Sequence, residues 1–149
     1  MIAVDANILI YAHRRDSPFH DRARAAMLRL AEDSQPWGIP WPCLHEFYCV
    51  ATHPRIYRTA STPDEAVTQV ELWLGSPAVT LLGESEAHWQ TLRSLVAAGK
   101  IKGPAVYDAR IAAICIEHGV KEFWTADRDF SRYPDLKPVN PLVVAEDRL

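Results

Sequence analysis

Four acidic residues that are far apart in the sequence occupy positions where an apolar or neutral residue is more usual. They are Asp5, Glu46, Asp108 and Asp127. Two unit charges about 4 Å apart repel each other by roughly 4 kcal/mol at an effective dielectric constant of about 20. If the fold gathers these carboxylates, a divalent cation is the natural means of keeping them ionised, because hard cations bind carboxylate oxygens. A cation held in this way can activate a bound water molecule for hydrolysis.

Two of the four acids directly follow segments with the composition of β-strands. Asp5 ends the apolar run 1–4, and Asp127 comes after the aromatic run 122–125. In parallel α/β sheets, ligands bind outside the carboxyl ends of the strands, near the point where the strand order reverses. Asp5 and Asp127 are therefore predicted to lie at the same ligand-binding edge of a sheet.

The other two acids are predicted to lie on helices, within stripes of apolar residues. The residues three, four and seven positions after Asp108 are apolar, and so are those three before and three and four after Glu46. Residues at these spacings share one helical face, so both acids are expected on buried stripes, where a carboxylate needs an explanation. We also expect both acids within about the first turn of their helices, where the helix dipole favours an anion.

Strands alternate with helices along the whole chain. Ser17 and Pro18 form a typical helix start, and the run 62–65, Thr-Pro-Asp-Glu, has the sequence of a capping box. The alternation predicts an α/β fold with a mainly parallel central sheet flanked by helices, with residues 1–149 forming a single domain. The predicted strands are 1–4, 37–41, 78–82 and 122–125, and the predicted helices are 7–12, 17–30, one that begins at 42, 62–74, 85–99 and 104–118.

The composition is that of an ordinary globular protein. The chain has 149 residues, of which 48% are hydrophobic, and a formal net charge of -3. A nucleic-acid partner would therefore need a local basic patch rather than a basic protein as a whole. No apolar stretch is long enough to span a bilayer and no signal peptide is evident, so we expect a cytoplasmic protein. The three cysteines, Cys43, Cys49 and Cys115, are interpreted as small core residues in a reducing compartment.

Each acid taken alone also has a structural explanation. Asp5 could form a turn or cap a helix, and Asp127 or Asp129 could be the N-cap of a short helix that follows. Glu46 or Asp108 could pair with an arginine. Four independent structural roles at one edge of one sheet are much less common, so the set carries the signal and no single member does.

Two other enzyme classes fit the sequence poorly. His45 and Glu46 begin like the zinc-protease motif, but Cys49 stands where the second histidine should be. A phosphatase that uses Asp5 as its nucleophile would need a second acid two positions later, where this chain has Asn7. Neither class is favoured.

The residues around the four acids resemble those of the PIN-domain nucleases. The resemblance is carried by Ile-Ala-Val-Asp-Ala-Asn at 2–7, by the helix that contains Glu46, by Tyr-Asp-Ala-Arg-Ile-Ala-Ala at 107–113, and by Thr-Ala-Asp-Arg-Asp-Phe at 125–130. Within that superfamily the chain is similar to VapC, the toxin of a bacterial type II toxin–antitoxin pair. The motifs occur in the family's order over nearly the whole chain. The resemblance implies a three-layer PIN-like fold.

The resemblance also implies an activity and a cofactor. PIN-domain toxins use such acids to hold Mg²⁺ or Mn²⁺ and to cleave RNA. By this match Asp5 and Asp108 are expected to be direct ligands, and Glu46 and Asp127 to complete the pocket, directly or through water. The metal would lower the pKa of a bound water, which would attack the phosphate and leave a 5′-phosphate product.

Further residues are predicted to support the site. Asp129 is a possible additional acid, and Asn7 and Thr125 are candidates to orient Asp5 or Asp127 by hydrogen bonds. An acidic pocket repels a polyanion, so a basic rim is expected. Arg14, Arg15 and Arg128 are the predicted substrate-binding residues.

The resemblance implies partners as well. It predicts an RNA substrate, a VapB-type antitoxin that blocks the acids, and a homodimer. The alternative is a PIN-like module that binds RNA or antitoxin without cutting, although the presence of all four acids argues against it.

Overall fold

The computed structural model describes residues 1–143, so residues 144–149 of the predicted domain lie outside the described part. A sheet of five strands forms its centre, in the order β3-β2-β1-β4-β5, and all four neighbouring pairs are parallel. The chain adds strands on one side of β1 and then continues on the other, so the strand order reverses between β1 and β4. The strands are β1 (Ile2–Val4), β2 (Trp37–Pro40), β3 (Val79–Leu82), β4 (Glu122–Trp124) and β5 (Pro138–Val139).

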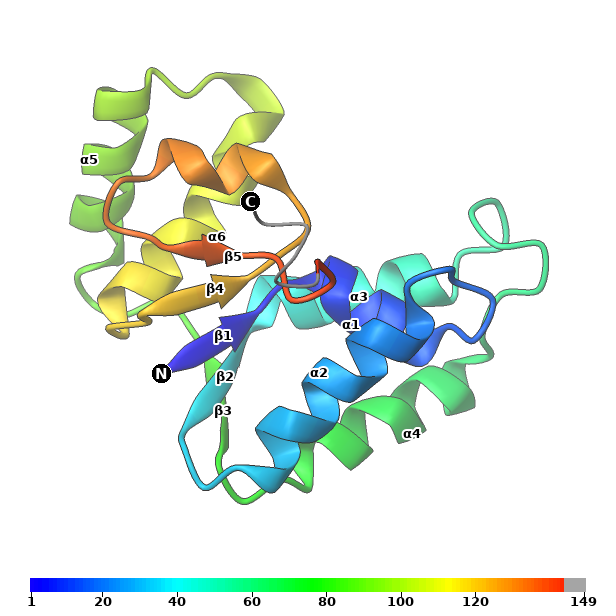
Figure 1. The fold of residues 1–149 in the computed structure, drawn as a ribbon. Helices are drawn as coiled ribbons and strands as arrows, with labels where there is room; N and C mark the ends of the chain where they lie inside the picture. The colour runs from blue at the N-terminus through cyan, green and yellow to red at the C-terminus, as the bar shows by residue number, and fades with distance from the viewer. Residues whose placement is uncertain (144–149) are drawn as a thin grey trace.

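Helices cover both faces of this sheet. Figure 1 shows α5 and α6 on one side and α1 to α4 on the other, and the contacts between α1 and α2 and between α5 and α6 are the most extensive among the helices. The predicted three-layer fold with a parallel central sheet is confirmed. The helices are α1 (Ala6–His13), α2 (His20–Glu32), α3 (Trp41–Ala51), α4 (Pro63–Leu74), α5 (His88–Gly99) and α6 (Val106–Glu117), with short 3-10 helices η1 (Gly103–Ala105) and η2 (Arg128–Arg132).

The core lies between the sheet and these two helical layers. Phe47 of α3 packs edge-on against Trp73 of α4, with 4.9 Å between ring centroids, and so joins two helices of one layer. Phe123 of β4 packs in the same manner on Phe130 of η2 at 4.8 Å, which fixes η2 against the sheet. Burial of such aromatic side chains supplies much of the stabilisation of a core. The position of η2 matters below, because acids flank its start.

The local signals predicted most helix starts well, but the helices predicted to start at Ser17 and Ser85 begin three residues later, at His20 and His88. The capping box is present: the Thr62 hydroxyl accepts from the Glu65 amide at 3.1 Å, and the Glu65 carboxylate accepts from the Thr62 amide at 3.1 Å. The helix predicted to start at Ser17 begins at His20 instead. The Ser17 hydroxyl accepts from the Phe19 amide at 3.1 Å, so it stabilises a turn before the helix rather than capping it.

Two further differences concern single residues and the tail. Cys43 and Cys115 are buried as predicted, but Cys49 is exposed on α3, so its assignment to the core was wrong. Strand β5 was not predicted, because it is only two residues long and begins with a proline. Among the described residues, no helix has both the length and the apolar character that a membrane crossing requires.

Candidate active site

Asp5 lies at the carboxyl end of β1, where it caps α1 and is 4% exposed. Its Oδ1 accepts from the Ala6 amide at 2.7 Å and from the Cys43 thiol at 3.5 Å. Its Oδ2 accepts from the Thr125 hydroxyl at 2.7 Å and from the Asn7 side-chain amide at 3.3 Å. These four donors hold both oxygens of Asp5 in one orientation.

The buried position of Asp5 makes its charge costly. Burial raises the pKa of this carboxyl above its ordinary value, and the nearby charge of Asp108 raises it further. The hydrogen bonds from Thr125, Ala6 and Cys43 stabilise the ionised form, but they offset only part of this effect. A cation close to Asp5 would relieve the remaining cost.

Asn7 and Thr125 connect Asp5 to the segment that follows β4. The Thr125 hydroxyl accepts from the Asn7 amide at 3.2 Å and from the Asp127 backbone amide at 3.0 Å. The Asn7 side-chain oxygen accepts from the Ala126 amide at 3.2 Å. The two residues predicted to support the acids therefore form one network that joins the ends of β1 and β4.

Three other acids form a close group beside this network. Asp108 lies in the first turn of α6, Asp127 is the N-cap of η2, and Asp129 lies in the first turn of η2. One carboxylate oxygen from each lies within 4.8 Å of the others. Burial raises the pKa of Asp108, the charges of Asp127 and Asp129 raise it further, and that of Arg132 lowers it. Such a group of oxygen donors suits a hard divalent cation.

Glu46 reaches the same region from α3, but not in the predicted way. It lies in the second turn of α3 and is exposed, so its expected place on a buried stripe in the first turn was wrong. Its pKa is nevertheless raised, first by partial desolvation and then by the charges of Asp5, Asp108 and Asp127. The four predicted acids thus share one electrostatic environment, and Glu46 is its most exposed member.

An open hollow borders the acids on the side of η2. It has a volume of about 340 Å³, and Thr125, Asp127 and Arg128 contribute to its wall. The Arg128 side chain is exposed at this hollow. Of the three arginines predicted to bind substrate, Arg128 is the one next to the acids in the chain and in the fold.

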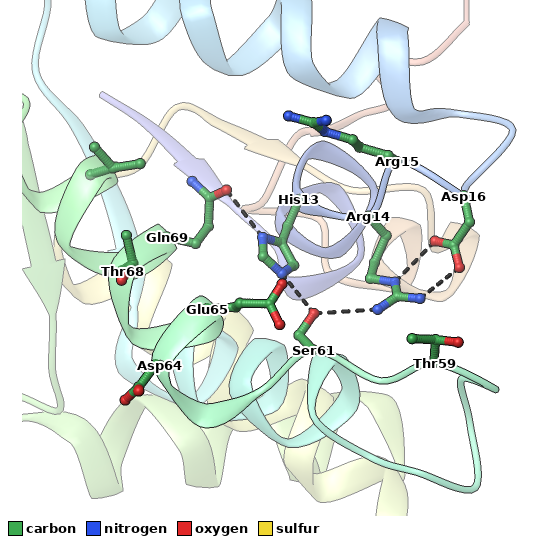
Figure 2. A pocket seen from close by; sticks show the side chains of 11 residues that line it. His13, Arg14, Arg15, Asp16, Thr59, Ser61, Asp64, Glu65, Thr68 and Gln69 are labelled. Atoms are coloured by element: carbon green, nitrogen blue, oxygen red, sulfur yellow. Dashed lines mark hydrogen bonds and ion pairs between the residues drawn. The ribbon is translucent and has the colours of Figure 1, made fainter.

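The other two predicted substrate-binding residues, Arg14 and Arg15, lie at the opposite end of α1 from Asp5. A helix of this length separates its two ends by about 12 Å. Arg14 is buried and forms an ion pair with Asp16 at 2.6 Å. Its guanidinium also donates to the Ser61 hydroxyl at 3.3 Å and stacks over the Tyr57 ring at 4.0 Å. Arg14 therefore serves the structure of this region, as its dashed contacts in Figure 2 illustrate.

A second, larger hollow of about 710 Å³ lies where α1 ends beside α4. His13 bridges its wall, with Nδ1 3.1 Å from the Gln69 oxygen and Nε2 2.8 Å from the Ser61 hydroxyl. Figure 2 shows Arg15 above this network, where it makes none of the drawn contacts and is exposed. The polar side chains here fasten α4 and the segment before it to α1.

Comparison with known proteins agrees with this architecture. The family model described as "PIN domain" matches residues 2–136. Ribonuclease VapC43 of Mycobacterium tuberculosis is 35% identical over 142 residues, which cover 95% of this chain and 96% of that protein. Ribonuclease VapC48 of the same species is 30% identical over 137 residues, which cover 92% of this chain and 94% of that protein.

A solved structure shows the same fold. The VapBC2 complex from Rickettsia felis, bound to a DNA fragment from its promoter, contains a chain that superimposes with a TM-score of 0.69 at 19% identity. The superposition covers 94% of this chain and 98% of that one. The superposition shows the fold, and the matched family model and the two relatives show the family: the chain belongs to the PIN-domain family and, within it, to the VapC ribonucleases.

Proposed function

We propose that this protein is a metal-dependent endoribonuclease and the toxin of a type II toxin–antitoxin pair. One observation carries the proposal: acids from β1, α3, α6 and η2 meet at the carboxyl edge of the sheet, where its strand order reverses. The relatives named above are ribonucleases by name, and their similarity extends over nearly the whole chain. RNA as the substrate also implies that the protein acts in the cytoplasm.

The residues present fit a divalent cation. Asp108 and Asp127, with Asp129 as an additional acid, offer oxygens close enough to share one ion, and Asp5 and Glu46 add charge from β1 and α3. An all-oxygen donor set favours Mg²⁺, with Mn²⁺ as a substitute. When bound, the metal would activate water and neutralise charge on the phosphate. The raised pKa values of Asp5, Asp108 and Glu46 support a site that is built to receive a cation.

The protein's own residues have separate tasks in this proposal. Thr125 and Asn7 hold Asp5 in one orientation, so the buried acid does not have to be ordered during the reaction. Glu46 is an exposed acid of the group, and its raised pKa suits a carboxylate that takes a proton from the attacking water. Attack of water on phosphorus breaks the bond to the 3′ oxygen of the preceding nucleotide, and this oxygen takes up a proton from solvent. The products then carry a 3′-hydroxyl and a 5′-phosphate.

Substrate and partners follow from the charge of the site. Arg128 is an exposed cation beside the acids, and we assign it to the RNA backbone. Arg15 is exposed farther along and could contact a longer RNA, whereas the paired and buried Arg14 supports the fold. We further propose a VapB-type antitoxin as the partner that neutralises the toxin, and a homodimer as its assembly.

An RNA-cleavage assay tests the proposal against a module that only binds. RNA is incubated with the protein and Mg²⁺ or Mn²⁺, with and without a chelator. The Asp108→Asn variant should lose cleavage, and the control Asp33→Asn, which changes an exposed acid at the end of α2, should retain it. RNA binding without cleavage in any metal would support the non-catalytic alternative instead.

A further inference from the structure

Cys43 contacts Asp5 from a different element than the other donors do. It lies in α3, its side chain is fully buried, and its sulfur is 3.5 Å from Oδ1 of Asp5. A thiol is a weak hydrogen-bond donor, and bonds to an ionised acceptor are stronger than bonds to a neutral one. The contact is therefore a directed polar interaction between a buried thiol and a buried carboxylate.

The four donors to Asp5 belong to different elements of the fold. Ala6 and Asn7 belong to α1, and Thr125 follows β4, so these three hold Asp5 to the two central strands. Among the described residues, Cys43 is the only donor to Asp5 from α3. Because Oδ1 has only the Ala6 amide as its other donor, removal of the thiol would leave that oxygen with one hydrogen bond.

α3 also carries Glu46, which acts on the same group of acids. Cys43 and Glu46 are three positions apart, a spacing at which helical side chains are neighbours. A bond from Cys43 to Asp5 therefore fixes α3, and with it Glu46, relative to β1. The thiol couples the orientation of the buried acid to the position of the exposed one.

We propose that Cys43 is a positioning residue of the active site, whose thiol orients Asp5 and fixes the position of α3 relative to it. The inference rests on the proposed function, because the orientation of Asp5 matters only if the acids bind a metal. The alternative is that Cys43 has only a packing role in the core, as small buried cysteines often do.

The chain provides a matched control for that alternative. Cys115 of α6 is also fully buried and lies close enough to Asp5 for that charge to raise its pKa. Among the described residues, however, it makes no hydrogen bond to Asp5. Truncation of either cysteine to alanine removes one buried sulfur, but only the Cys43 variant removes a donor to the carboxylate.

The test measures Mn²⁺ binding to metal-free protein by electron paramagnetic resonance, together with Tm and RNA cleavage. The variants are Cys43→Ala, Cys43→Ser and Cys115→Ala. Loss of a group that orients a metal-binding residue typically weakens metal affinity roughly 10–100-fold, and for a weak donor we expect about 10-fold in Cys43→Ala. Cys43→Ser keeps a donor and should recover affinity to within about 3-fold of wild type, while Cys115→Ala should leave it unchanged.

The outcomes separate the two roles of Cys43. If Cys43→Ala and Cys115→Ala lower Tm alike and bind Mn²⁺ as tightly as wild type, Cys43 only fills the core and the inference is overturned. The same holds if Cys43→Ser binds no better than Cys43→Ala. If wild type neither binds Mn²⁺ nor cleaves RNA, the proposed function fails and this inference fails with it. A loss of affinity confined to Cys43→Ala, in a protein that cleaves RNA, supports both.

Discussion

The Thr125 hydroxyl donates a 2.7 Å hydrogen bond to Oδ2 of Asp5, although the two residues are 120 positions apart in the sequence. The bond joins the carboxyl ends of β1 and β4, between which the strand order of the sheet reverses. It therefore places Asp5 beside the segment that carries Asp127 and Asp129. The active site depends on this junction of two strands as much as on the acids themselves.

Removal of the Thr125 hydroxyl should impair activity, because this hydroxyl donates to Asp5 and accepts from Asn7 and from the Asp127 amide. Thr125→Val keeps the shape of the side chain but leaves Asp5 without its shortest side-chain donor. Loss of such an orienting group typically costs roughly 10–100-fold in activity, and we expect kcat to fall in that range with KM for RNA nearly unchanged. Thr125→Ser retains the hydroxyl and should remain active. Equal activity of Thr125→Val and wild type would show that the bond does not serve the reaction.

Neutralisation of Asp108 should stabilise the metal-free protein while abolishing cleavage. The pKa of Asp108 is raised, so its ionised form is disfavoured in the folded state, and Asp108→Asn removes that cost. At neutral pH with chelator present, we expect Tm to rise, and each change of about 1 kcal/mol would correspond to roughly 2–4 °C in a chain of this size. Calorimetry of wild type and variant measures this directly.

The pH dependence of that difference has a definite sign. A carboxyl with a raised pKa binds more protons when folded, so its ionisation penalty is present above the folded pKa and disappears as the pH falls through it. The advantage of Asp108→Asn should therefore be largest at neutral pH and shrink on acidification. An advantage that grows as the pH falls would contradict the raised pKa of Asp108.

Metal should stabilise the folded protein. A ligand at about 100 times its Kd adds roughly 2.7 kcal/mol to the free energy of unfolding, so saturating Mn²⁺ should raise Tm clearly over the chelated protein. Protons compete for Asp5, Glu46 and Asp108, whose pKa values are raised, so this stabilisation should weaken at a higher pH than for ordinary carboxylates. Thermal scans over a pH series, with Mn²⁺ or chelator, test both statements. Identical Tm values in both conditions at neutral pH would argue against a metal site.

Truncation of Arg128 should weaken RNA binding, whereas truncation of Arg14 should lower the stability of the fold. Arg128→Ala removes an exposed cation beside the acids, so we expect a higher KM for RNA. The slope of log binding constant against log salt concentration should decrease in magnitude by about 0.7, the value for one phosphate contact to a single strand. Arg14→Ala breaks the contacts to Asp16, Ser61 and Tyr57 and should cost about 1–2 kcal/mol of stability. Arg24→Ala, at an exposed position on α2, is the control for both.

Should Arg128→Ala bind RNA as wild type does at every salt concentration, the basic rim must lie elsewhere. Should Arg14→Ala weaken RNA binding without loss of stability, the role assigned to its buried ion pair would be wrong.

The sequence predicted the parts of the site that depend on strand ends. Asp5 and Asp127 follow strands, and the parallel sheet then brings them to one edge regardless of detailed packing. Their capping roles are real as well: Asp5 caps α1 and Asp127 caps η2, so a cap and a place in the acidic group coexist in one residue. The roles of these acids as metal ligands, and the single-domain organisation, stay predictions.

Features that depend on side-chain direction were harder to predict. An apolar neighbourhood predicted Glu46 on a buried stripe with Cys49. The buried stripe of α3 instead consists of Cys43, Leu44, Phe47 and Ala51, so Glu46 and Cys49 lie outside it. Nothing in the sequence pairs Cys43 with Asp5, because the contact forms only when α3 packs against α1, whose N-cap is Asp5. A local run of basic residues likewise gives no sign that Arg14 turns inward to Asp16 and Tyr57.

The identity of the nucleophile tests the central claim most directly. An RNA with a single 2′-deoxy substitution at the cleaved linkage cannot react through its own hydroxyl there, so only an external water can cut it. With Mg²⁺ or Mn²⁺, we expect wild type to cleave this RNA as it cleaves the unmodified one and to leave a 5′-phosphate, and expect chelator or Asp108→Asn to stop the reaction. Resistance of the substituted RNA, cyclic phosphate ends on the normal one, or cleavage that persists in chelator would contradict a metal-dependent hydrolysis at these acids.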